Sequence, residues 1–536
     1  MGGLKGKVVL ISDASAPSGK VFAEKFAEQG AVLALNFTEE RDAGAGAYSY
    51  NTATGAGARA LVDDVVRDHG GIDVLIHNDN EVTKFSIQES TDAQVKLAMD
   101  RNAKTAFMLT QAAGGYMKDH GGGSIVYVSS IHAGKPSGSS FAYSMAKSMV
   151  GLLCKEVVLD LSPYGVRANV IEMGPIAGDT ETYASDISRL YDHVDLKIKG
   201  RDLGDWEQAA NLALFLSDDG CPFLNGQSIQ LDGGFLLHYG YRFTYDEWEQ
   251  SKEEVMRRMA EWAAKNNASP QTEDEPQKVL TGMNLAGKIA VITGSATGVG
   301  QGIAVRFAAE GAKVVVTHNN APADKTMAMI REVGGTAIDV GCNVGNEEDV
   351  IRLIAAAKEN FGGLDILVNN AAIQYNKWIL EYSEEEYDTI ININADAYVR
   401  CIRHAAPLLK ESKSGRIINI GSIHSKRPTG FDSVYTMSKA ANLLLAREAA
   451  IELAAWGVTA NTITIGAINI GVKSGAPFFR PPNRPPNVRE MPYGHLLSGK
   501  VGTPPEVGFM AAFLASDESR FITGSALRAD GGIMMV

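Results

Sequence analysis

The sequence predicts an α/β protein built from two tandem domains, each a doubly wound parallel sheet with helices on both faces. Strand-like and helix-like runs alternate from Leu4 to about Phe235, and the same order restarts at Leu285. Such alternation is typical of parallel sheets made of βαβ units. Matching residues in the two halves also keep constant offsets over long stretches, which indicates a tandem duplication.

The offsets between matching residues show where the two halves differ. Near the start of each half the offset is 281, as between Gly30 and Gly311. From Asn51 onward it is 292, and at the closing Asp-Gly-Gly it is 298. The first half therefore lacks eleven residues between Gly30 and Asn51, in the crossover after its second predicted strand. The second half has six extra residues between Asn461 and Asp530.

The repeat divides the chain into a first domain over 1–240, a connecting segment over 241–283 and a second domain over 284–536. Within the connecting segment, the apolar spacing of Tyr245–Lys265 predicts a helix that packs on its own protein or, alternatively, binds a partner. The polar, proline-containing stretch Asn266–Lys278 is predicted to be a flexible linker.

The composition excludes several classes of protein. The chain has 536 residues, of which 45% are hydrophobic and 21% charged, and its net charge is −13. This charge argues against a broad surface for nucleic acid or anionic lipid. There is no apolar run of the roughly 18 residues that a membrane span needs, and no signal peptide, so we expect a cytoplasmic protein. The four cysteines lie far apart, and we expect buried free thiols and no metal site.

A glycine-rich turn near the start of the second half indicates a dinucleotide site. It lies between a strand predicted over Lys288–Thr293 and a helix predicted over Gln301–Glu310, with the spacing Gly294-x-x-x-Gly298-x-Gly300. In Rossmann-like domains such a turn lets backbone N–H groups and the helix N-terminus approach a pyrophosphate.

Four polar residues follow the glycine turn in an order that suggests a catalytic site. Tyr435 and Lys439 are four residues apart on a predicted helix and therefore share one face. Ser422 follows a strand predicted over Arg416–Ile420, and Asn394 lies on the preceding helix-like run. In open parallel sheets, ligands bind at the carboxyl ends of the strands, where these residues are expected.

With Asn369-Asn370-Ala371 after the strand Ile366–Val368, this joint order resembles the short-chain dehydrogenase/reductase family. The resemblance covers both halves and implies an NAD(P)-dependent oxidoreductase that interconverts a secondary alcohol and a ketone. The implied cofactor-binding residues are Gly294, Thr297, Gly298, Val299, Gly300, Asn319, Asn343, Val344, Asn370, Ala371, Tyr435, Lys439 and Ile468.

The resemblance also implies a catalytic role for each of the four polar residues. Tyr435 is the expected general acid/base, and a nearby Lys439 ammonium should lower its pKa from about 10 by favouring the phenolate. Lys439 would also hold the nicotinamide ribose, Ser422 would bind the substrate oxygen, and Asn394 would position a water in a proton relay.

The preferred coenzyme and substrate are less well defined by the sequence. The segment Thr317–Asn320 has no acid for a ribose hydroxyl, and Thr297 stands where NADP-preferring relatives often carry a basic residue, so both NAD and NADP remain open. The run Gly466–Asn469 and the Ser422-x-His424 pair resemble bacterial glucose dehydrogenases, which favours a sugar, polyol or hydroxy acid.

Two features near the predicted substrate site have alternative interpretations. His424 either lines the pocket or is a structural residue of its loop. The segment after Ile470 is rich in proline and contains Arg480, Arg484 and Arg489. It is either a lid that pairs arginine with an anionic substrate or a rigid interface loop.

The first half keeps the four polar residues but not the glycine turn. Asn102, Ser130, Tyr143 and Lys147 retain the spacings of the second-half set. Its turn, however, has Asp13 and Pro17 at the positions of Gly294 and Gly298, and only Gly19 is kept. A carboxylate repels a pyrophosphate, and proline removes an N–H and adds bulk. His77–Asn80 adds a further acid. We predict a scaffold or pseudoenzyme domain with a vestigial tetrad.

Two alternative functions remain. A two-centre enzyme could couple an oxidation to a reduction, as in an epimerisation, if the first half binds coenzyme. A non-enzymatic dinucleotide-binding or sensor protein would bind coenzyme without turnover. Because members of the family commonly form dimers and tetramers, we expect a homodimer of fused chains that resembles a tetramer. The expected partner is a small-molecule substrate, with no nucleic acid and no membrane.

Overall fold

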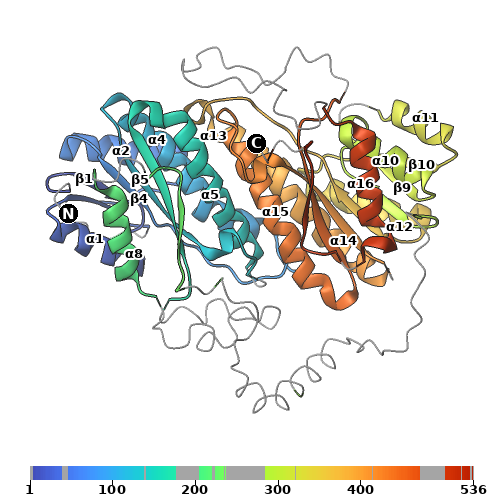
Figure 1. Ribbon diagram of the computed structural model, residues 1–536, viewed down its shortest axis with the longest axis horizontal. Helices are drawn as coiled ribbons and strands as arrows, with labels where there is room; N and C mark the ends of the chain where they lie inside the picture. Colours follow the sequence, from blue (N-terminus) through green and yellow to red (C-terminus); the bar gives the residue numbers. More distant parts are fainter. Residues whose placement is uncertain are drawn as a thin grey trace.

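The computed structural model contains two seven-stranded sheets, both parallel throughout the strand pairs described. It describes residues 4–38, 46–137, 140–176, 204–219, 224–233, 236, 257, 284–319, 322–412, 414–470, 501–520, 522–531 and 534. The strand orders are β3-β2-β1-β4-β5-β6-β7 and β10-β9-β8-β11-β12-β13-β14. Figure 1 shows the two lobes side by side. The predicted tandem α/β fold is confirmed.

The first half alternates strands and helices as the sequence predicts. Its strands are β1 (Val8–Ile11), β2 (Val32–Asn36), β3 (Ala47–Tyr48), β4 (Val74–His77), β5 (Gly123–Ser130), β6 (Val166–Met173) and β7 (Ser228–Leu231). Its helices are α1 (Pro17–Glu28), α2 (Gly55–His69), α3 (Asp92–Met99), the π-helical turn η1 (Asp100–Lys104), α4 (Thr105–Asp119), η2 (Ile131–Ala133), α5 (Phe141–Leu161), η3 (Ser162–Tyr164) and α8 (Trp206–Ser217).

The second half repeats this order. Its strands are β8 (Ile289–Ile292), β9 (Lys313–His318), β10 (Thr336–Gly341), β11 (Ile366–Asn369), β12 (Arg416–Ser422), β13 (Thr459–Ile465) and β14 (Ala526–Ala529). Its helices are α10 (Gly298–Ala309), α11 (Asp324–Glu332), α12 (Glu347–Phe361), η5 (Ile379–Glu381), α13 (Glu384–Ile391), the π-helical turn η6 (Asn392–Asp396), α14 (Ala397–Glu411), η7 (Ile423–Ser425), α15 (Ser433–Leu453), η8 (Ala454–Trp456), α16 (Pro504–Ala515) and η10 (Asp517–Ser519).

The central strands are buried on both faces, which explains their continuous apolar runs. All four residues of β1 and all four of β8 are buried. Strands covered by helices on both sides lose the alternation of apolar and polar residues. In the first sheet β1 lies between β2 and β4, and in the second sheet β8 lies between β9 and β11. The strand order therefore reverses beside β1 and beside β8. The crevice at such a reversal is where open α/β sheets bind ligands.

The two halves differ at the third strand of each sheet, where the first half lacks eleven residues. In the second half α11 lies between β9 and the six-residue strand β10. In the first half β3 has two residues, and the described residues between β2 and β3 form no helix. The deletion thus falls in the crossover between β2 and β3, where the sequence places it, and residues 39–45 of that crossover lie outside the described residues.

The two halves share one hydrophobic core. A single cluster of buried apolar residues includes members of both halves, among them Leu10, Phe107, Leu153, Val291, Tyr387 and Leu445. Phe107 on α4 lies 4.9 Å from the ring of Tyr387 and 6.1 Å from the ring of Tyr382, measured between centroids. Figure 1 shows α5 and α15 packed alongside each other at the centre of the molecule. Burial of this surface is the main force that holds the halves together.

Polar contacts across this interface occur in related pairs. The Asp160 carboxylate accepts a hydrogen bond from Ile379 N at 3.0 Å, and the Glu452 carboxylate accepts one from Ile87 N at 2.7 Å. The offset of 292 relates Asp160 to Glu452 and Ile87 to Ile379. The halves therefore pack about a pseudo-two-fold axis, as two copies of one domain do in a symmetric dimer.

Ionic contacts between the halves break this symmetry: Arg400 and Arg403 of the second half contact Asp92, whereas their first-half equivalents are uncharged. Lys104 Nζ lies 2.9 Å from the Glu384 carboxylate and 2.7 Å from the Asp388 carboxylate. The residue equivalent to Lys104 in the second half is Asp396, which has the opposite charge. The contact surfaces of the two halves are thus related in shape but complementary in charge.

Several predictions concern segments that the structure does not describe. Tyr245–Lys265, apart from Arg257, lies outside the described residues, as do Asn266–Lys278 and residues 471–500 with their three arginines. The proposed domain boundaries therefore stay predictions.

The thiols of Cys154, Cys342 and Cys401 are free and buried, as expected, and Cys221 lies outside the described residues. Among the helices in the described ranges, none is long and apolar enough to cross a membrane.

Candidate active site

The glycine turn between β8 and α10 needs glycine at each of its three positions. Gly294 and Gly298 have φ angles of +63° and +61°, in the left-handed region that other residues rarely adopt. A Cβ on Gly300 would lie 2.4 Å from Gly294 O and 2.6 Å from Asn370 Nδ2. Thr297 precedes the first turn of α10 and forms no side-chain cap in the described structure. The turn therefore fits a diphosphate, with backbone N–H groups available to bind it.

Side chains from neighbouring strands hold this turn in place. Thr293 Oγ1 accepts hydrogen bonds from Asn370 N at 2.9 Å and Ala371 N at 3.1 Å. Asn370 Nδ2 donates to Thr293 O and Gly294 O, and Gly294 N donates to Thr317 Oγ1 at 2.7 Å. The sequence analysis assigned no role to Thr293 and used Thr317 only to discuss coenzyme preference. Both residues could have been identified from their position, because each is a threonine at the carboxyl end of a buried strand.

The remaining predicted cofactor residues lie at the same edge of the sheet. Asn319 is exposed directly after β9, and Asn343 and Val344 follow β10. Val299 is in the first turn of α10, and Ile468 forms an isolated bridge to Gly502 after β13. These positions follow the carboxyl ends of four strands of one sheet, where a dinucleotide would extend.

Three of the four predicted catalytic residues lie together. Ser422 is the last residue of β12, and Tyr435 and Lys439 are on the first turns of α15. Tyr435 is hydrogen-bonded to the Ser422 side chain. Lys439 Nζ donates to Ile420 O at 3.0 Å and lies 5.5 Å from the centroid of the Tyr435 ring. A substrate oxygen bound beside Ser422 would reach the phenol directly.

The ionisation of this pair differs from the sequence-based expectation. Removal from water raises the pKa of Tyr435 to about 12, although the hydrogen bond from Ser422 opposes the shift. Burial likewise lowers the pKa of Lys439 to about 7. The net pKa of Tyr435 is therefore raised and not lowered as the sequence analysis expected, because desolvation of the phenol is its largest cause. The phenol holds its proton at neutral pH.

Asn394 lies in the π-helical turn η6, which interrupts the run from α13 to α14. Its Oδ1 accepts from Ile373 N at 2.8 Å, and its Nδ2 donates to Ile373 O at 2.8 Å and Ser438 Oγ at 3.2 Å. π-helical turns are rare and are frequent at functional sites. The side chain fixes the segment that follows β11, and its role in a proton relay stays a prediction.

His424 closes the turn that follows Ser422. Its backbone N–H donates to Ser422 Oγ, and its Nδ1 lies 3.0 Å from Arg427 O. Burial lowers the pKa of His424 to about 4, so the imidazole is neutral. The first half repeats this arrangement, with His132 Nδ1 3.0 Å from Lys135 O. The structure favours the structural interpretation of His424 over a pocket role.

The first half keeps its tetrad in the same places. Asn102 lies in the π-helical turn η1, and its Oδ1 accepts from Glu81 N at 3.0 Å. Tyr143 and Lys147 are on α5, and Ser130 ends β5. The fold around the four polar residues has thus been conserved between the halves.

The first-half turn does not fit a diphosphate. Asp13 stands at the position of Gly294, is buried, and accepts a hydrogen bond from Ser15 N at 3.0 Å. The Asp79 carboxylate contacts Ser12 Oγ in the same crevice. Burial raises the pKa of both aspartates, and either one in its ionised form would repel an anion beside it. Pro17 is the first residue of α1 and has no N–H to offer.

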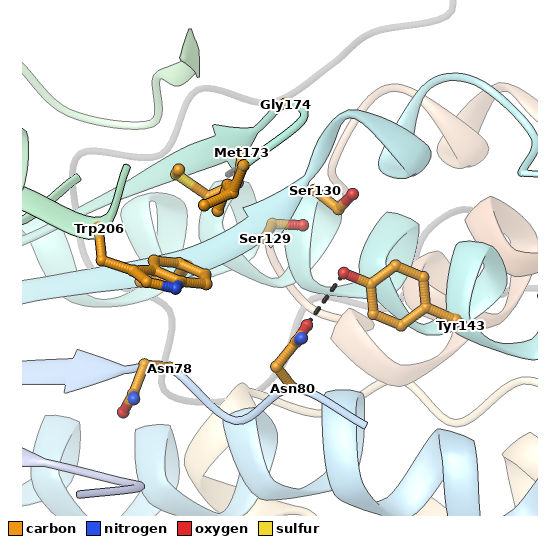
Figure 2. A pocket seen from close by; sticks show the side chains of 10 residues that line it. Asn78, Asn80, Ser129, Ser130, Tyr143, Met173, Gly174 and Trp206 are labelled. Carbon is orange, nitrogen blue, oxygen red and sulfur yellow. Dashed lines mark hydrogen bonds between the residues drawn. The ribbon is translucent and has the colours of Figure 1, made fainter. Parts of the chain in front are cut away.

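A small cavity of about 20 Å³ lies beside Ser130 and Tyr143 of the first-half tetrad. Figure 2 shows the indole of Trp206 and the phenol of Tyr143 facing this cavity from opposite sides. Tyr143 donates a hydrogen bond to Asn80 Oδ1 at 2.9 Å. Trp206 begins α8, and the equivalent residue at the start of α16 is Pro504. The bulky indole further narrows the space beside Ser130 and Tyr143.

A doubly wound sheet with a glycine turn and a Ser-Tyr-Lys set defines an NAD(P)-dependent oxidoreductase that acts on CH–OH groups. The sequence model of a family described as enoyl-(acyl carrier protein) reductase matches residues 18–236 and again residues 294–534. The chain belongs to the short-chain dehydrogenase/reductase family, as a tandem fusion of two of its domains.

Curated relatives match about one half of the chain. The 2,5-dichloro-2,5-cyclohexadiene-1,4-diol dehydrogenase LinX of Sphingobium indicum is 39% identical over 249 residues, which cover 46% of this chain and 96% of the relative. The 3beta-hydroxysteroid dehydrogenase 1 of Eggerthella lenta is 36% identical over 255 residues, covering 47% and 95%. A solved mutant of a Serratia marcescens short-chain dehydrogenase/reductase is 27% identical, with a TM-score of 0.42, covering 46% and 98%.

Proposed function

We propose that the protein interconverts a secondary alcohol and a ketone with NAD or NADP, with turnover confined to the second half. The contrast between the two turns carries this proposal. Gly294 and Gly298 leave the α10 N-terminus open to a diphosphate, whereas Asp13 and Pro17 put a buried acid and an imino acid at the matching positions. The first half then acts as a scaffold, a pseudoenzyme domain whose tetrad is vestigial.

The coenzyme, when bound, supplies or accepts a hydride. The turn Gly294–Gly300 would hold its diphosphate, and Lys439 its nicotinamide ribose. Ser422 binds the substrate oxygen, and Tyr435 gives a proton to that oxygen in reduction or takes one from it in oxidation. Because its pKa is raised, Tyr435 is protonated at neutral pH and is ready to act as the acid.

The two curated relatives guide the choice of substrate class. Their names specify a cyclohexadienediol and a hydroxysteroid, both of which carry hydroxyl groups on carbon rings. This supports a ring-borne secondary alcohol, and a cyclic sugar or polyol belongs to the same class. The segment Thr317–Asn319 contains neither an acidic residue nor an arginine, so the proposal includes both NAD and NADP.

Titration of the full-length chain with NAD(H) and NADP(H) tests where the coenzyme binds. We expect one equivalent per chain, because only the second-half turn fits a diphosphate. Two equivalents would overturn the scaffold role and support a two-centre enzyme. One equivalent without turnover of any cyclic alcohol or ketone would instead support a dinucleotide sensor.

We further propose a homodimer of fused chains, which would contain four family domains. One pair of domains is already joined within the chain through α4, α5, α14 and α15. Light scattering of the purified protein should give about twice the chain mass of 57.2 kDa. A mass equal to one chain at micromolar concentration would contradict the dimer. The cytoplasmic location stays a prediction.

A further inference from the structure

A carboxylate of the first half binds the loop that precedes the catalytic helix of the second half. Glu156 lies on α5 and is fully buried. Its Oε1 accepts hydrogen bonds from Thr429 N at 2.7 Å and Thr436 Oγ1 at 2.7 Å, and its Oε2 accepts one from Gly430 N at 2.8 Å. Thr436 is the immediate neighbour of Tyr435. One side chain therefore joins the loop to the first turn of α15.

The loop held by Glu156 connects two groups of the proposed catalytic set. It begins after the turn that Ser422 caps, and it ends at Asp432, directly before α15. Asp432 is buried and accepts a hydrogen bond from Tyr382 OH at 2.7 Å. Because Ser422 and Tyr435 share a hydrogen bond, a shift of this loop would change the distance between them. Small displacements of that kind weaken catalysis strongly.

We propose that Glu156 of the first half is a positioning residue for the Ser422–Tyr435 pair of the second half. This inference rests on the proposed function, because it requires the second half to be the site of turnover. The first half would then contribute directly to catalysis in the second half. Glu156 touches neither substrate nor coenzyme and acts through Thr429, Gly430 and Thr436.

The pseudo-two-fold axis provides a matched control. Glu448 on α15 is the equivalent of Glu156, and its Oε1 accepts hydrogen bonds from Ser137 N at 2.6 Å and Ser137 Oγ at 3.1 Å. Ser137 lies in the loop that precedes Tyr143 in the first half. Each glutamate thus binds the loop that precedes the tyrosine of the opposite half, although Ser144, the counterpart of Thr436, forms no hydrogen bond to Glu448. Only Glu156 acts on the half that is proposed to turn over substrate.

The test compares Glu156→Gln and Glu448→Gln in the full-length chain. Glutamine keeps the size of the side chain but replaces one acceptor oxygen with a donor, so it cannot satisfy all the donors that face Glu156. We expect kcat of E156Q to fall by about 10- to 100-fold, while the coenzyme dissociation constant changes by less than about 2-fold. E448Q should keep kcat within about 2-fold, although both variants lower the melting temperature.

The outcomes separate this inference from the proposed function. Equal kcat in the two variants would overturn the role of Glu156 and leave the proposed function standing. A fall in the kcat of E448Q alone would place turnover in the first half and overturn both the inference and the proposed function.

If E156Q does not fold, Thr436→Val removes one hydrogen bond to the same carboxylate, and kcat should fall about 5-fold, as the loss of about 1 kcal/mol predicts. Ser144→Ala at the matching first-half position should leave kcat unchanged, and an equal effect of the two variants would again overturn the inference.

Discussion

Replacing Tyr435 with phenylalanine is expected to reduce turnover by about 10²- to 10⁴-fold, the usual contribution of a positioned general acid or base. The substitution removes only the hydroxyl that is hydrogen-bonded to Ser422 and keeps the ring in its place. Coenzyme binding should stay within about 2-fold of the wild type, because the diphosphate site lies at the glycine turn. Steady-state kinetics and a coenzyme titration measure the two effects separately.

Tyr143→Phe is the control for this experiment. Tyr143 occupies the equivalent position on α5 and is hydrogen-bonded to Asn80, in the half whose turn does not fit a diphosphate. Its substitution should leave kcat unchanged. Full activity in the Tyr435 variant would refute the assigned acid/base, and loss of activity only in the Tyr143 variant would place turnover in the first half.

Gly294→Asp should weaken coenzyme binding strongly, because it gives the second half the residue that the first half carries at this position. A Cβ at this position would lie 3.0 Å from Ala371 Cα, on a backbone with φ of +63°. The new carboxylate would face the diphosphate, and two like charges about 4 Å apart cost about 4 kcal/mol near a protein surface. The dissociation constant should therefore rise by about 100- to 1000-fold. Isothermal titration measures the constant, and circular dichroism checks the fold.

The reverse substitution in the first half is the matched control. Asp13→Gly should not create a second coenzyme site, because Pro17 and the Asp79 carboxylate remain in the crevice. The stoichiometry should stay at one coenzyme per chain. Near-normal binding by the Gly294 variant would show that the turn does not hold the diphosphate.

Sequence reasoning succeeded where the signal is local. Strand alternation, the offset of 292 and the glycine spacing each depend on residues close together in the chain or on repetition. They gave the fold, the duplication and the positions of Ser422, Tyr435 and Lys439. The effect of Asp13 and Pro17 on the first-half turn could also be predicted, because it follows from the chemistry of these two residues alone.

Sequence reasoning failed where tertiary contacts decide the property. The raised pKa of Tyr435 comes from burial beneath other elements, which no spacing reveals. Trp206 faces the Tyr143 cavity from a helix more than sixty residues later in the chain. Glu156 meets Thr429 from the other half, a separation of 273 residues. Each pairing depends on how the halves or layers pack, and a single sequence holds no pattern that predicts it.

The reversed charge at Lys104 and Asp396 has a consequence for the history of the gene. Two second halves docked in the same way would set Asp396 against Glu384 and Asp388, and the nearest cations would be arginines, because Arg400 and Arg403 contact Asp92, the equivalent of Glu384. Two first halves would keep an acid beside Lys104, because Asp92 is equivalent to Glu384, but they would set Lys96 in the place of Asp388. The contact of Lys104 with two carboxylates therefore favours association of the two unlike halves, and fusion supplies these halves in equal numbers.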